Sequence, residues 1–433
     1  MKVNLSRRKE EINETFKLPG DKSIAHRAVI IGSLAKGEYT VSNFPNNEDC
    51  KSTLSCMEAL GVTIAIDGTT VFINSPGYEN FNKQPGILYC GNSGTTARLL
   101  SGVLAGCGIE GVLDGDDSLR RRPMSRIISP LREMGAALES DSGLLPLHFY
   151  PNKNLKGIEY FMQVPSAQVK SCVLIAGFLS KEKTVVIEYD STRDHTERLF
   201  KYLGADIKVD GNRIDISFQQ LKARNIAVPG DISSAAFLIG YALLCKNCCI
   251  KIEGVLLNER RISFLRLLKN MGANIEYNYE NTINGEELGY IIIKESKLKG
   301  IIFEENEIAN IIDEIPILAV LSCFSEGNTI FKGIAELKYK ESDRIKAIAY
   351  NLKQCGARFK YSEDYLEIEG GMEDLNKDIV IHPFLDHRIA LAFAAIGCRN
   401  YKSTVIEQWE CTNISFPNAL NYLKEIFNLE TEL

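Results

Sequence analysis

Side chains suited to small anions recur along this 433-residue chain, each time beside a turn. In PGDKSIAHR, the residues Lys22, Ser23 and Arg27 surround one predicted helix start, and two cations with a hydroxyl suit a phosphate or a carboxylate. The segment does not complete the GxxxxGKS/T pattern of a P-loop. Further donors of this kind are Asn92 and Gly94 in GNSGTTAR, Arg122 in DSLRRRPM, Ser166 and Gln168 in VPSAQVK, and Arg193 in STRDHTERLF. A solvated helix end or a capped turn is the ordinary alternative for each.

Carboxylates lie in unusual surroundings in the second half of the chain. Asp313 and Glu314 interrupt the apolar run IIDEIPILAV, where a charge is costly unless it is paired or used. Further charges are Lys340, Glu341 and Arg344 in ELKYKESDRI, and Asp386, His387 and Arg388 in FLDHRIALAF. A solvated charged helix and an Asp-capped helix start are the ordinary explanations of these two segments. Many cations with a few carboxylates and no nucleophilic triad favour transfer of a group between two anionic small molecules.

The elements that position these residues form a block that occurs six times. Each copy opens with a turn that enters an apolar helix, followed by a strand, a second helix and a further strand. The openings are LPGDKSIAHR, YCGNSGTTAR, VPSAQVK, VPGDISSAAF, DEIPIL and FLDHRIAL. A helix N-terminus presents unpaired N–H groups and a partial positive charge, so several of them together would bind a multiply charged anion. The copies lie roughly seventy residues apart, farther than in common solenoids.

The second helix of five copies ends in the same way, with a glycine before a strand. The glycines are Gly61, Gly135, Gly204, Gly272 and Gly356. Glycine at this position predicts a left-handed C-cap. The sixth copy, ALNYLKEIF, lacks the glycine and is expected to run to the C-terminus as a helix.

Six copies divide naturally into two domains of three. A break near Gly230 separates the third copy from the fourth, and residues 1–18 contain a possible strand that pairs back with the later copies. We therefore expect one globular domain from residues 1–18 plus 230–433 and another from residues 19–229, with the active site in the cleft between them.

Composition restricts the class of protein. A net charge of −6 without a basic block argues against a nucleic-acid partner. No signal peptide is expected from MKVNLSRRKEE, and apolar helices of roughly ten residues are too short to cross a membrane. The twelve cysteines are scattered, as buried thiols in a reducing cytoplasm would be. The pair Cys245 and Cys248 lacks a second ligand pair for zinc, so we expect no metal site.

Taken in order, these segments resemble the 5-enolpyruvylshikimate-3-phosphate (EPSP) synthase family, in the version common in Gram-positive bacteria. The resemblance rests on LPGDKSIAHR, GNSGTTARLL, DSLRRRPM, PSAQVKS, STRDHTERL, PGDISSAAF, DEIPILA, ELKYKESDRI and DHRIALA, which span nearly the whole chain. It implies the enolpyruvyl transferase fold: two inside-out, barrel-like α/β domains, each of three βαβαββ repeats.

The resemblance also implies an activity. Members transfer the enolpyruvyl group of phosphoenolpyruvate to the 5-hydroxyl of shikimate 3-phosphate by addition and elimination, in the shikimate pathway to chorismate and aromatic amino acids. Asp313 would be the base and Glu341 the proton donor, assisted by Lys22 and His387. No metal or organic cofactor is implied, and the expected protein is a cytoplasmic monomer, a glyphosate target, with no nucleic-acid or membrane partner.

The binding residues are carried over by motif. For shikimate 3-phosphate they are Lys22, Ser23, Arg27, Ser166, Gln168, Arg193, Asp313 and Lys340. For phosphoenolpyruvate they are Lys22, Asn92, Gly94, Arg122, Gln168, Arg344 and Arg388. One departure concerns the C-terminal segment, where Ile414 replaces a lysine that reaches phosphoenolpyruvate in many members.

Three alternatives to EPSP synthase activity remain open. An enolpyruvyl transferase acting on UDP-N-acetylglucosamine would use a mobile-loop cysteine, but DGDDSLRRRP before Arg122 contains none and Cys107 lies in the preceding turn. A non-catalytic anion-binding paralogue is motivated by Ile414 alone. An RNA-end-processing enzyme is opposed by the acidic charge.

Overall fold

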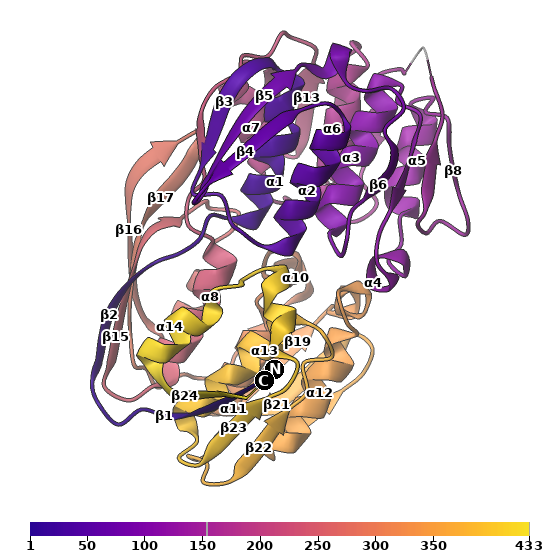
Figure 1. The fold of residues 1–433 in the computed structure, drawn as a ribbon. Coiled ribbons are helices and arrows are strands. Elements are labelled where there is room, and N and C mark those ends of the chain that lie inside the picture. The colour runs from indigo at the N-terminus through magenta and orange to yellow at the C-terminus, as the bar shows by residue number, and fades with distance from the viewer. Residues whose placement is uncertain (153–154, 433) are drawn as a thin grey trace. The chain divides into compact units, whose positions relative to one another are not determined.

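The computed structural model describes residues 1–152 and 155–432, which form two compact units (Figure 1). Unit 1 comprises Met1–Leu18, Gly230–Asn281 and Glu287–Leu433, and unit 2 comprises Pro19–Pro229 and Thr282–Glu286. Residues 153–154 and 433, which fall within the predicted domain ranges, lie outside the described residues. The short segment Thr282–Glu286, the tip of a hairpin, was not anticipated as part of unit 2.

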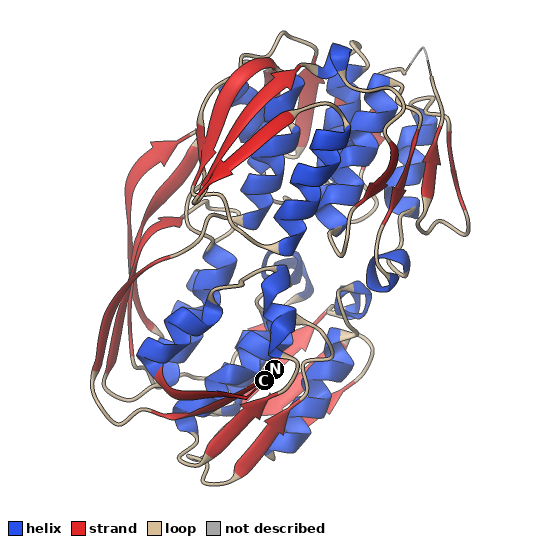
Figure 2. Ribbon diagram, viewed as in Figure 1, coloured by secondary structure: helices blue, strands red, loops and turns tan. Residues whose placement is uncertain are grey.

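Each unit contains three four-stranded sheets. In unit 2 the strand orders are β14-β3-β5-β4, β6-β7-β9-β8 and β10-β11-β13-β12, and in unit 1 they are β16-β17-β15-β2, β18-β19-β21-β20 and β22-β23-β1-β24. One edge strand of every sheet runs parallel to its neighbour. Within each unit, helices lie on the inner side of the sheets (Figure 2). The predicted α/β fold of repeated units is confirmed.

The three repeats of unit 2 follow one another along the chain. The first contains α1 (Lys22–Ile30), β3 (Lys36–Ser42), α2 (Glu48–Ala59), β4 (Thr63–Asp67) and β5 (Thr70–Pro76). The second contains β6 (Gly86–Tyr89), α3 (Gly94–Cys107), β7 (Gly111–Asp114), α4 (Asp117–Arg120), α5 (Ser125–Glu133), β8 (Leu138–Ser140) and β9 (Leu147–Phe149). The third contains β10 (Glu159–Phe161), α6 (Ala167–Leu179), β11 (Thr184–Ile187), α7 (His195–Leu203), β12 (Asp206–Asp210) and β13 (Arg213–Ser217), and β14 (Ile226–Ala227) follows.

Unit 1 repeats the same plan. Its first repeat contains α8 (Ile232–Leu244), β15 (Cys248–Leu256), α9 (Ser263–Asn270), β16 (Asn274–Ile283) and β17 (Glu286–Lys294). The second contains β18 (Ile302–Phe303), α10 (Glu305–Ile311), α11 (Ile315–Cys323), β19 (Asn328–Lys332), η3 (Ala335–Tyr339), α12 (Arg344–Cys355), β20 (Arg358–Tyr361) and β21 (Tyr365–Glu369). The third contains β22 (Asp378–Ile381), α13 (His387–Ala394), η4 (Ala395–Arg399), β23 (Ser403–Ile406), η5 (Trp409–Ile414), α14 (Ala419–Ile426) and β24 (Phe427–Glu432).

The two N-terminal strands complete sheets of unit 1. The strand β1 (Lys2–Arg7) lies between β23 and β24, and β2 (Ile12–Lys17) runs parallel to β15. Although β2 directly precedes α1, it thus belongs to a sheet of the other unit. In the same way, β14 directly precedes α8 but pairs with β3 in unit 2. The chain therefore passes from one unit to the other between β2 and α1 and again between β14 and α8, and the hairpin tip Thr282–Glu286 adds a brief return to unit 2.

The expectation that the sixth copy ends as a helix is wrong. The helix α14 ends at Ile426, and β24 follows and pairs with all six residues of β1. The pairing explains the difference: Phe427 is buried, and the partner strand comes from the other end of the chain, which local sequence does not reveal.

The other local predictions are confirmed. The five C-cap glycines have φ between 80° and 101°, a left-handed conformation that glycine adopts without a steric penalty. The first helices are buried on nearly every face, and all residues of α8 and α11 are buried. Within the described part of the chain, no helix has both the length and the apolarity needed to cross a membrane.

Candidate functional site

The N-terminal ends of α1, α3 and α6 are joined inside unit 2. Each helix is capped by a side-chain oxygen, from Asp21, Ser93 and Ser166 respectively. The amide Nε2 of Gln168 donates to Thr95 Oγ1 at 2.9 Å, which connects the first turn of α6 to that of α3. Because all three ends carry unpaired N–H groups, they provide the positive end-charge that an anion requires.

Lys22 begins α1 and stays partly exposed. Its ammonium Nζ lies 2.9 Å from Asp49 Oδ2 at the start of α2, and the two side chains are 18% and 9% exposed. The other carboxylate oxygen, Asp49 Oδ1, is buried and makes no hydrogen bond among the described residues. Lys22 is therefore held in place by a carboxylate that the sequence analysis did not single out, 27 residues away along the chain.

Arg27 has a different environment from Lys22. Its side chain is buried, and Nε donates to Thr196 Oγ1 at 2.8 Å, Nη2 to Ser171 Oγ at 2.7 Å and Nη1 to the carbonyl of Ser23 at 2.8 Å. These contacts join α1 to α6 and α7. A direct contact between Arg27 and a ligand stays a prediction, as it does for Ser23, which is half-buried.

Arg122 and Asn92 form a pair next to α3. Arg122 Nη2 donates to Asn92 Oδ1 at 2.6 Å, and Asn92 Nδ2 donates to Asp116 Oδ2 at 2.7 Å. Only 8% of Arg122 is exposed, and its Nε is buried without a hydrogen bond among the described residues. A buried guanidinium with a spare donor is suited to binding an anion.

Arg98 is a functional candidate that the sequence analysis missed. Its Nη1 donates to Gln168 Oε1 at 2.8 Å and its Nη2 to the Pro123 carbonyl at 3.2 Å. The available signal was its spacing: it stands four residues after Gly94, one helical turn along the same face. We call Asn92, Arg98, Arg122 and Gln168 the cation–amide cluster.

Gly94 is the first residue of α3 and leaves room for Arg98. A Cβ atom added there would lie 2.6 Å from Arg98 Nη1 and 3.6 Å from Arg122 Nη1. Because the nearest atom is the end of a flexible side chain, Arg98 would move and its contact with Gln168 would weaken. If phosphoenolpyruvate binds next to Gly94, as the sequence resemblance implies, Gly94→Ala should raise the KM for this ligand about tenfold in steady-state assays.

A double-mutant cycle tests that explanation. If displacement of Arg98 causes the effect, Gly94→Ala should change KM little in an Arg98→Ala background. An undiminished effect in that background would assign it to some other clash.

A series of buried hydrogen-bonded polar side chains joins α1, α2 and α3. His26 Nδ1 is 2.6 Å from Thr53 Oγ1, which is 2.6 Å from Thr96 Oγ1, and Thr96 donates to Ser93 Oγ at 2.7 Å. Burial, together with the nearby charges of Lys22 and Arg27, lowers the pKa of His26 well below its usual value.

The lowered pKa predicts a pH-dependent stability. Below about pH 6.5 the unfolded chain binds a proton at His26 that the folded chain does not, so this group lowers stability as the pH falls, with a slope that approaches about 1.4 kcal/mol per pH unit. Between about pH 7.5 and 5.5, where the unfolded histidine goes from mostly neutral to mostly protonated, urea unfolding should show a total loss of stability that is about 1.4 kcal/mol smaller in His26→Gln than in wild type. Equal slopes in the two proteins would contradict the assignment.

In unit 1, three carboxylates contact Arg344 at the start of α12. Its Nε lies 2.8 Å from Asp386 Oδ2 and its Nη1 lies 3.4 Å from Asp313 Oδ1, while its Nη2 donates to Glu341. Arg388 reaches the same group, with Nη1 2.8 Å from the Asp313 carbonyl and Nη2 3.7 Å from Asp313 Oδ2. We call Asp313, Glu341, Arg344, Asp386 and Arg388 the carboxylate cluster.

Arg344 stays charged although its side chain is only 1% exposed. Burial opposes the charge, but the carboxylates of Asp386, Glu341 and Asp313 together raise the pKa of Arg344 above its usual value. Asp313 and Glu341 retain 17% and 18% exposure, respectively. Two partly exposed carboxylates on one guanidinium can accept and donate protons while the cation keeps them oriented.

The N-terminal ends of α8, α11 and α13 are linked around this cluster. Ser233 Oγ in α8 donates to Glu314 Oε1 at 2.8 Å, and Glu314 Oε1 lies 3.9 Å from Arg388 Nη1 in α13. Arg261 Nη2 also donates to Ser233 Oγ at 3.1 Å. Unit 1 therefore repeats the arrangement of unit 2, three helix starts side by side. The sequence predicted a helix opening at VPGDISSAAF, but Asp231, Ser233 and Arg261 were not named as site residues.

The remaining predicted residues are distributed over both units. His387 is buried at the start of α13, Lys340 follows η3, and Ser166 and Arg193 are half-buried in unit 2. Ile414 ends η5 and is half-buried. The helix η5 packs against α13, next to the carboxylate cluster.

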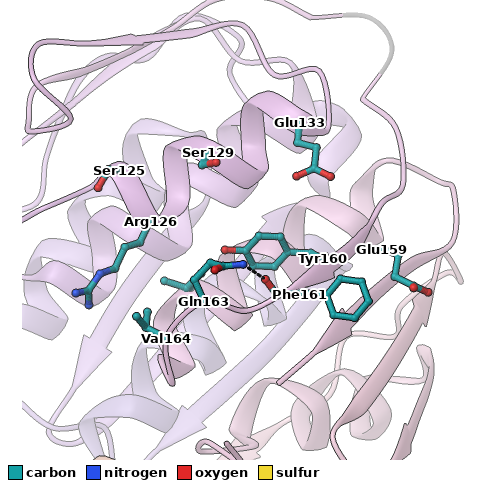
Figure 3. A pocket seen from close by; sticks show the side chains of 10 residues that line it. Ser125, Arg126, Ser129, Glu133, Glu159, Tyr160, Phe161, Gln163 and Val164 are labelled. Atoms are coloured by element: carbon teal, nitrogen blue, oxygen red, sulfur yellow. Dashed lines mark hydrogen bonds between the residues drawn. The ribbon is translucent and has the colours of Figure 1, made fainter. Parts of the chain in front are cut away.

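A separate pocket of about 600 Å³ lies in unit 2 between α5, β10 and the start of α6 (Figure 3). Its lining includes Arg126, Glu133, Tyr160, Phe161 and Gln163. In Figure 3 the ring of Tyr160 lies beside Gln163, whose Nε2 donates to the Phe161 carbonyl at 3.3 Å. None of the residues predicted to bind or react lines it, so the candidate site is defined by the helix starts and not by this pocket.

Comparisons with known proteins show which family this chain resembles over nearly its whole length. Residues 7–423 match the family model of EPSP synthase (3-phosphoshikimate 1-carboxyvinyltransferase). A 3-phosphoshikimate 1-carboxyvinyltransferase from Clostridium tetani is 51% identical over 421 residues, which cover 97% of this chain and 96% of that protein. EPSP synthase from Acinetobacter baumannii has a TM-score of 0.87 at 36% identity, over 99% of this chain and 100% of that one.

A more distant structure shares the fold alone. The enolpyruvyl transferase NikO from Streptomyces tendae has a TM-score of 0.81 at 14% identity, over 99% of this chain and 98% of that one. Because the family model and relatives well above 30% identity cover almost the whole sequence, the chain is a member of the EPSP synthase family.

Proposed function

We propose that this protein is a 3-phosphoshikimate 1-carboxyvinyltransferase. It transfers the enolpyruvyl group of phosphoenolpyruvate to the 5-hydroxyl of shikimate 3-phosphate and releases inorganic phosphate, a step of the shikimate pathway to chorismate and the aromatic amino acids. The observation that carries this proposal is membership of the EPSP synthase family over residues 7–423. The cation–amide and carboxylate clusters supply residues of the required chemistry.

The first half of the proposed reaction is an addition. Asp313 takes the proton of the 5-hydroxyl while that oxygen bonds to C2 of phosphoenolpyruvate, and Glu341 gives a proton to C3. Arg344 contacts both carboxylates, so it can keep the base and the acid oriented toward the same substrate. The product of this step is a tetrahedral adduct that still carries the phosphate.

The second half is an elimination. A proton leaves the new methyl group at C3, the double bond to C2 returns, and the bond from C2 to the phosphate oxygen breaks. Glu341 accepts the proton, and Lys22 stabilises the departing phosphate, with His387 assisting charge and proton movement.

Arginine and lysine neutralise the two anionic substrates in this proposal, in the role that a metal ion has in many phosphoryl-transfer enzymes. For shikimate 3-phosphate the proposed contacts are Lys22, Ser23, Arg27, Ser166, Gln168, Arg193, Asp313 and Lys340. For phosphoenolpyruvate they are Lys22, Asn92, Gly94, Arg122, Gln168, Arg344 and Arg388. Both proposed sets include residues of unit 1 and of unit 2.

The test is a phosphate-release assay with purified protein and no added metal. Phosphate should appear with phosphoenolpyruvate and shikimate 3-phosphate, and not with UDP-N-acetylglucosamine as acceptor. Release with the nucleotide sugar alone would make this a different enolpyruvyl transferase. Release with neither, from protein that still binds shikimate 3-phosphate, would indicate an inactive paralogue, and Ile414→Lys would be the first reversion to try.

We also propose that the protein acts as a monomer in the cytoplasm without a nucleic-acid partner. The net charge of −6 supports the last point, because a nucleic-acid surface needs clustered cations. Light scattering during gel filtration would give the mass: 48.3 kDa supports a monomer, and twice that value contradicts it.

A further inference from the structure

A fully buried group of three charges lies behind the start of α6 in unit 2. Lys170 Nζ is 2.9 Å from Glu188 Oε1 and 2.6 Å from Glu197 Oε1, and the three side chains are 0%, 0% and 4% exposed. Glu197 Oε2 is also buried and makes no hydrogen bond among the described residues. Apolar residues of similar volume often stabilise a fold equally well or better, so stability alone does not account for such a group.

The group holds one residue of the neighbouring connection, Thr192. Glu188 Oε1 accepts hydrogen bonds from the Thr192 backbone N–H at 2.9 Å and from its hydroxyl at 2.5 Å. Lys170 Nζ lies 3.5 Å from the Thr192 carbonyl. The hydroxyl, amide and carbonyl of one residue are therefore all held by the Lys170–Glu188 pair.

Thr192 lies in the connection that carries Arg193. This connection joins β11, which ends at Ile187, to α7, which begins at His195, and it has no regular hydrogen-bonded structure of its own. Its conformation next to Arg193 is thus fixed by side-chain contacts. Thr192 itself is only 6% exposed.

Lys170, the cation of this pair, belongs to the first turns of α6. Lys170 lies one turn after the N-cap, and its backbone N–H donates to the Ser166 carbonyl at 3.0 Å. Ser166 and Gln168 stand in that turn. One buried lysine therefore connects the segment that carries Arg193 to the helix start that carries Ser166 and Gln168.

We propose that Lys170 and Glu188 are positioning residues, which act through Thr192 to hold Arg193 at a fixed distance from Ser166 and Gln168 for the phosphate of shikimate 3-phosphate. This inference rests on the proposed function of those three residues as contacts of that substrate. A guanidinium held in place before binding loses less conformational freedom when the anion arrives. The pair would thus determine affinity for one substrate and leave the chemical step unchanged.

Thr192→Val tests the proposal, because it removes the hydroxyl and retains the size and branching of the side chain. Removal of Lys170 would leave two buried carboxylates without a cation and could prevent folding. We expect Thr192→Val to raise the KM for shikimate 3-phosphate about tenfold, with kcat and the KM for phosphoenolpyruvate within about twofold of wild type. Thr192→Ser should restore the wild-type KM.

Thr184→Val is the matched control. Thr184 lies in β11 of the same repeat, and its hydroxyl is buried without a hydrogen bond among the described residues, so this change should alter neither kinetic constant. An equal effect of Thr184→Val would overturn the proposal, and so would a Thr192→Ser protein that behaves like Thr192→Val.

Arg193→Ala separates a failure of this proposal from a failure of the proposed site. If Arg193→Ala raises the KM for shikimate 3-phosphate and Thr192→Val does not, Arg193 is a contact but the positioning role of Lys170 and Glu188 is wrong. If neither variant changes that KM, the proposed role of Arg193 is wrong, and the positioning role with it. If Thr192→Val lowers kcat and raises both KM values together, Thr192 only maintains the fold.

Discussion

Asp313→Asn should lower kcat by two or more decades while the affinity for shikimate 3-phosphate changes by less than about tenfold. The amide keeps the shape of the carboxylate and can still accept from Arg344 Nη1, which lies 3.4 Å away, but it cannot take a proton from the substrate hydroxyl. Steady-state phosphate release gives kcat, and calorimetric titration with shikimate 3-phosphate gives the affinity.

Asp343→Asn provides the control for this prediction. Asp343 caps α12 beside Arg344, and asparagine caps a helix about as well as aspartate, so kcat should stay within about twofold. An Asp313→Asn protein that loses binding and turnover in equal measure would show that Asp313 only positions the substrate. Unchanged turnover would assign the base to another group.

Arg344→Met should destabilise the protein by about 3–5 kcal/mol and abolish measurable turnover. Arg344 is the cation shared by Asp313, Glu341 and Asp386, and Asp386 is completely buried. Without Arg344 the buried carboxylate of Asp386 loses its cation and the three carboxylates repel one another, and phosphoenolpyruvate loses a proposed contact. Urea unfolding gives the free energy of unfolding of the variant and of wild type.

Arg358→Met serves as the control in the same unit. Arg358 pairs with Glu369 on β20 and β21, where the two side chains are 73% and 46% exposed. Such a pair contributes little, so the free energy of unfolding should change by less than about 0.5 kcal/mol. A loss below about 1 kcal/mol for Arg344→Met would mean that the carboxylate cluster tolerates the missing cation.

Local features of the fold could be predicted from sequence, because each is encoded within a few residues. The C-cap glycines, the capped helix starts and the apolar first helices all follow from neighbouring residue types. Contacts between residues far apart in the chain could not be predicted from sequence. The partner of β24 is β1, more than 400 residues away, and the hairpin tip Thr282–Glu286 joins unit 2 through contacts such as that of His195 Nδ1 with Glu286 Oε1 at 2.7 Å.

The candidate site shows the same division. Residue types such as Lys22, Asp313 and Arg388 stood out because charges beside apolar helices need a reason. The residues that hold these charges in place could not be recognised in the sequence, because Asp49, Arg98 and Ser233 look like ordinary surface or capping residues. Arg27 was predicted from sequence to contact a ligand, but it is buried in the interior of unit 2. Because α1 is buried on almost every side, the pattern of apolar residues in this helix could not show which of its cations points inward.

The exchange of edge strands has a consequence for how the protein is made on the ribosome. Unit 2 has all its strands once β14 has been synthesised, near residue 227, apart from the tip at Thr282–Glu286. Unit 1 instead needs β1 and β2, the first strands to emerge, and β24, the last. During translation the two earliest strands must therefore remain without their partners while an entire unit folds after them. The polar and charged residues of KVNLSR and INETFK would keep those waiting strands soluble.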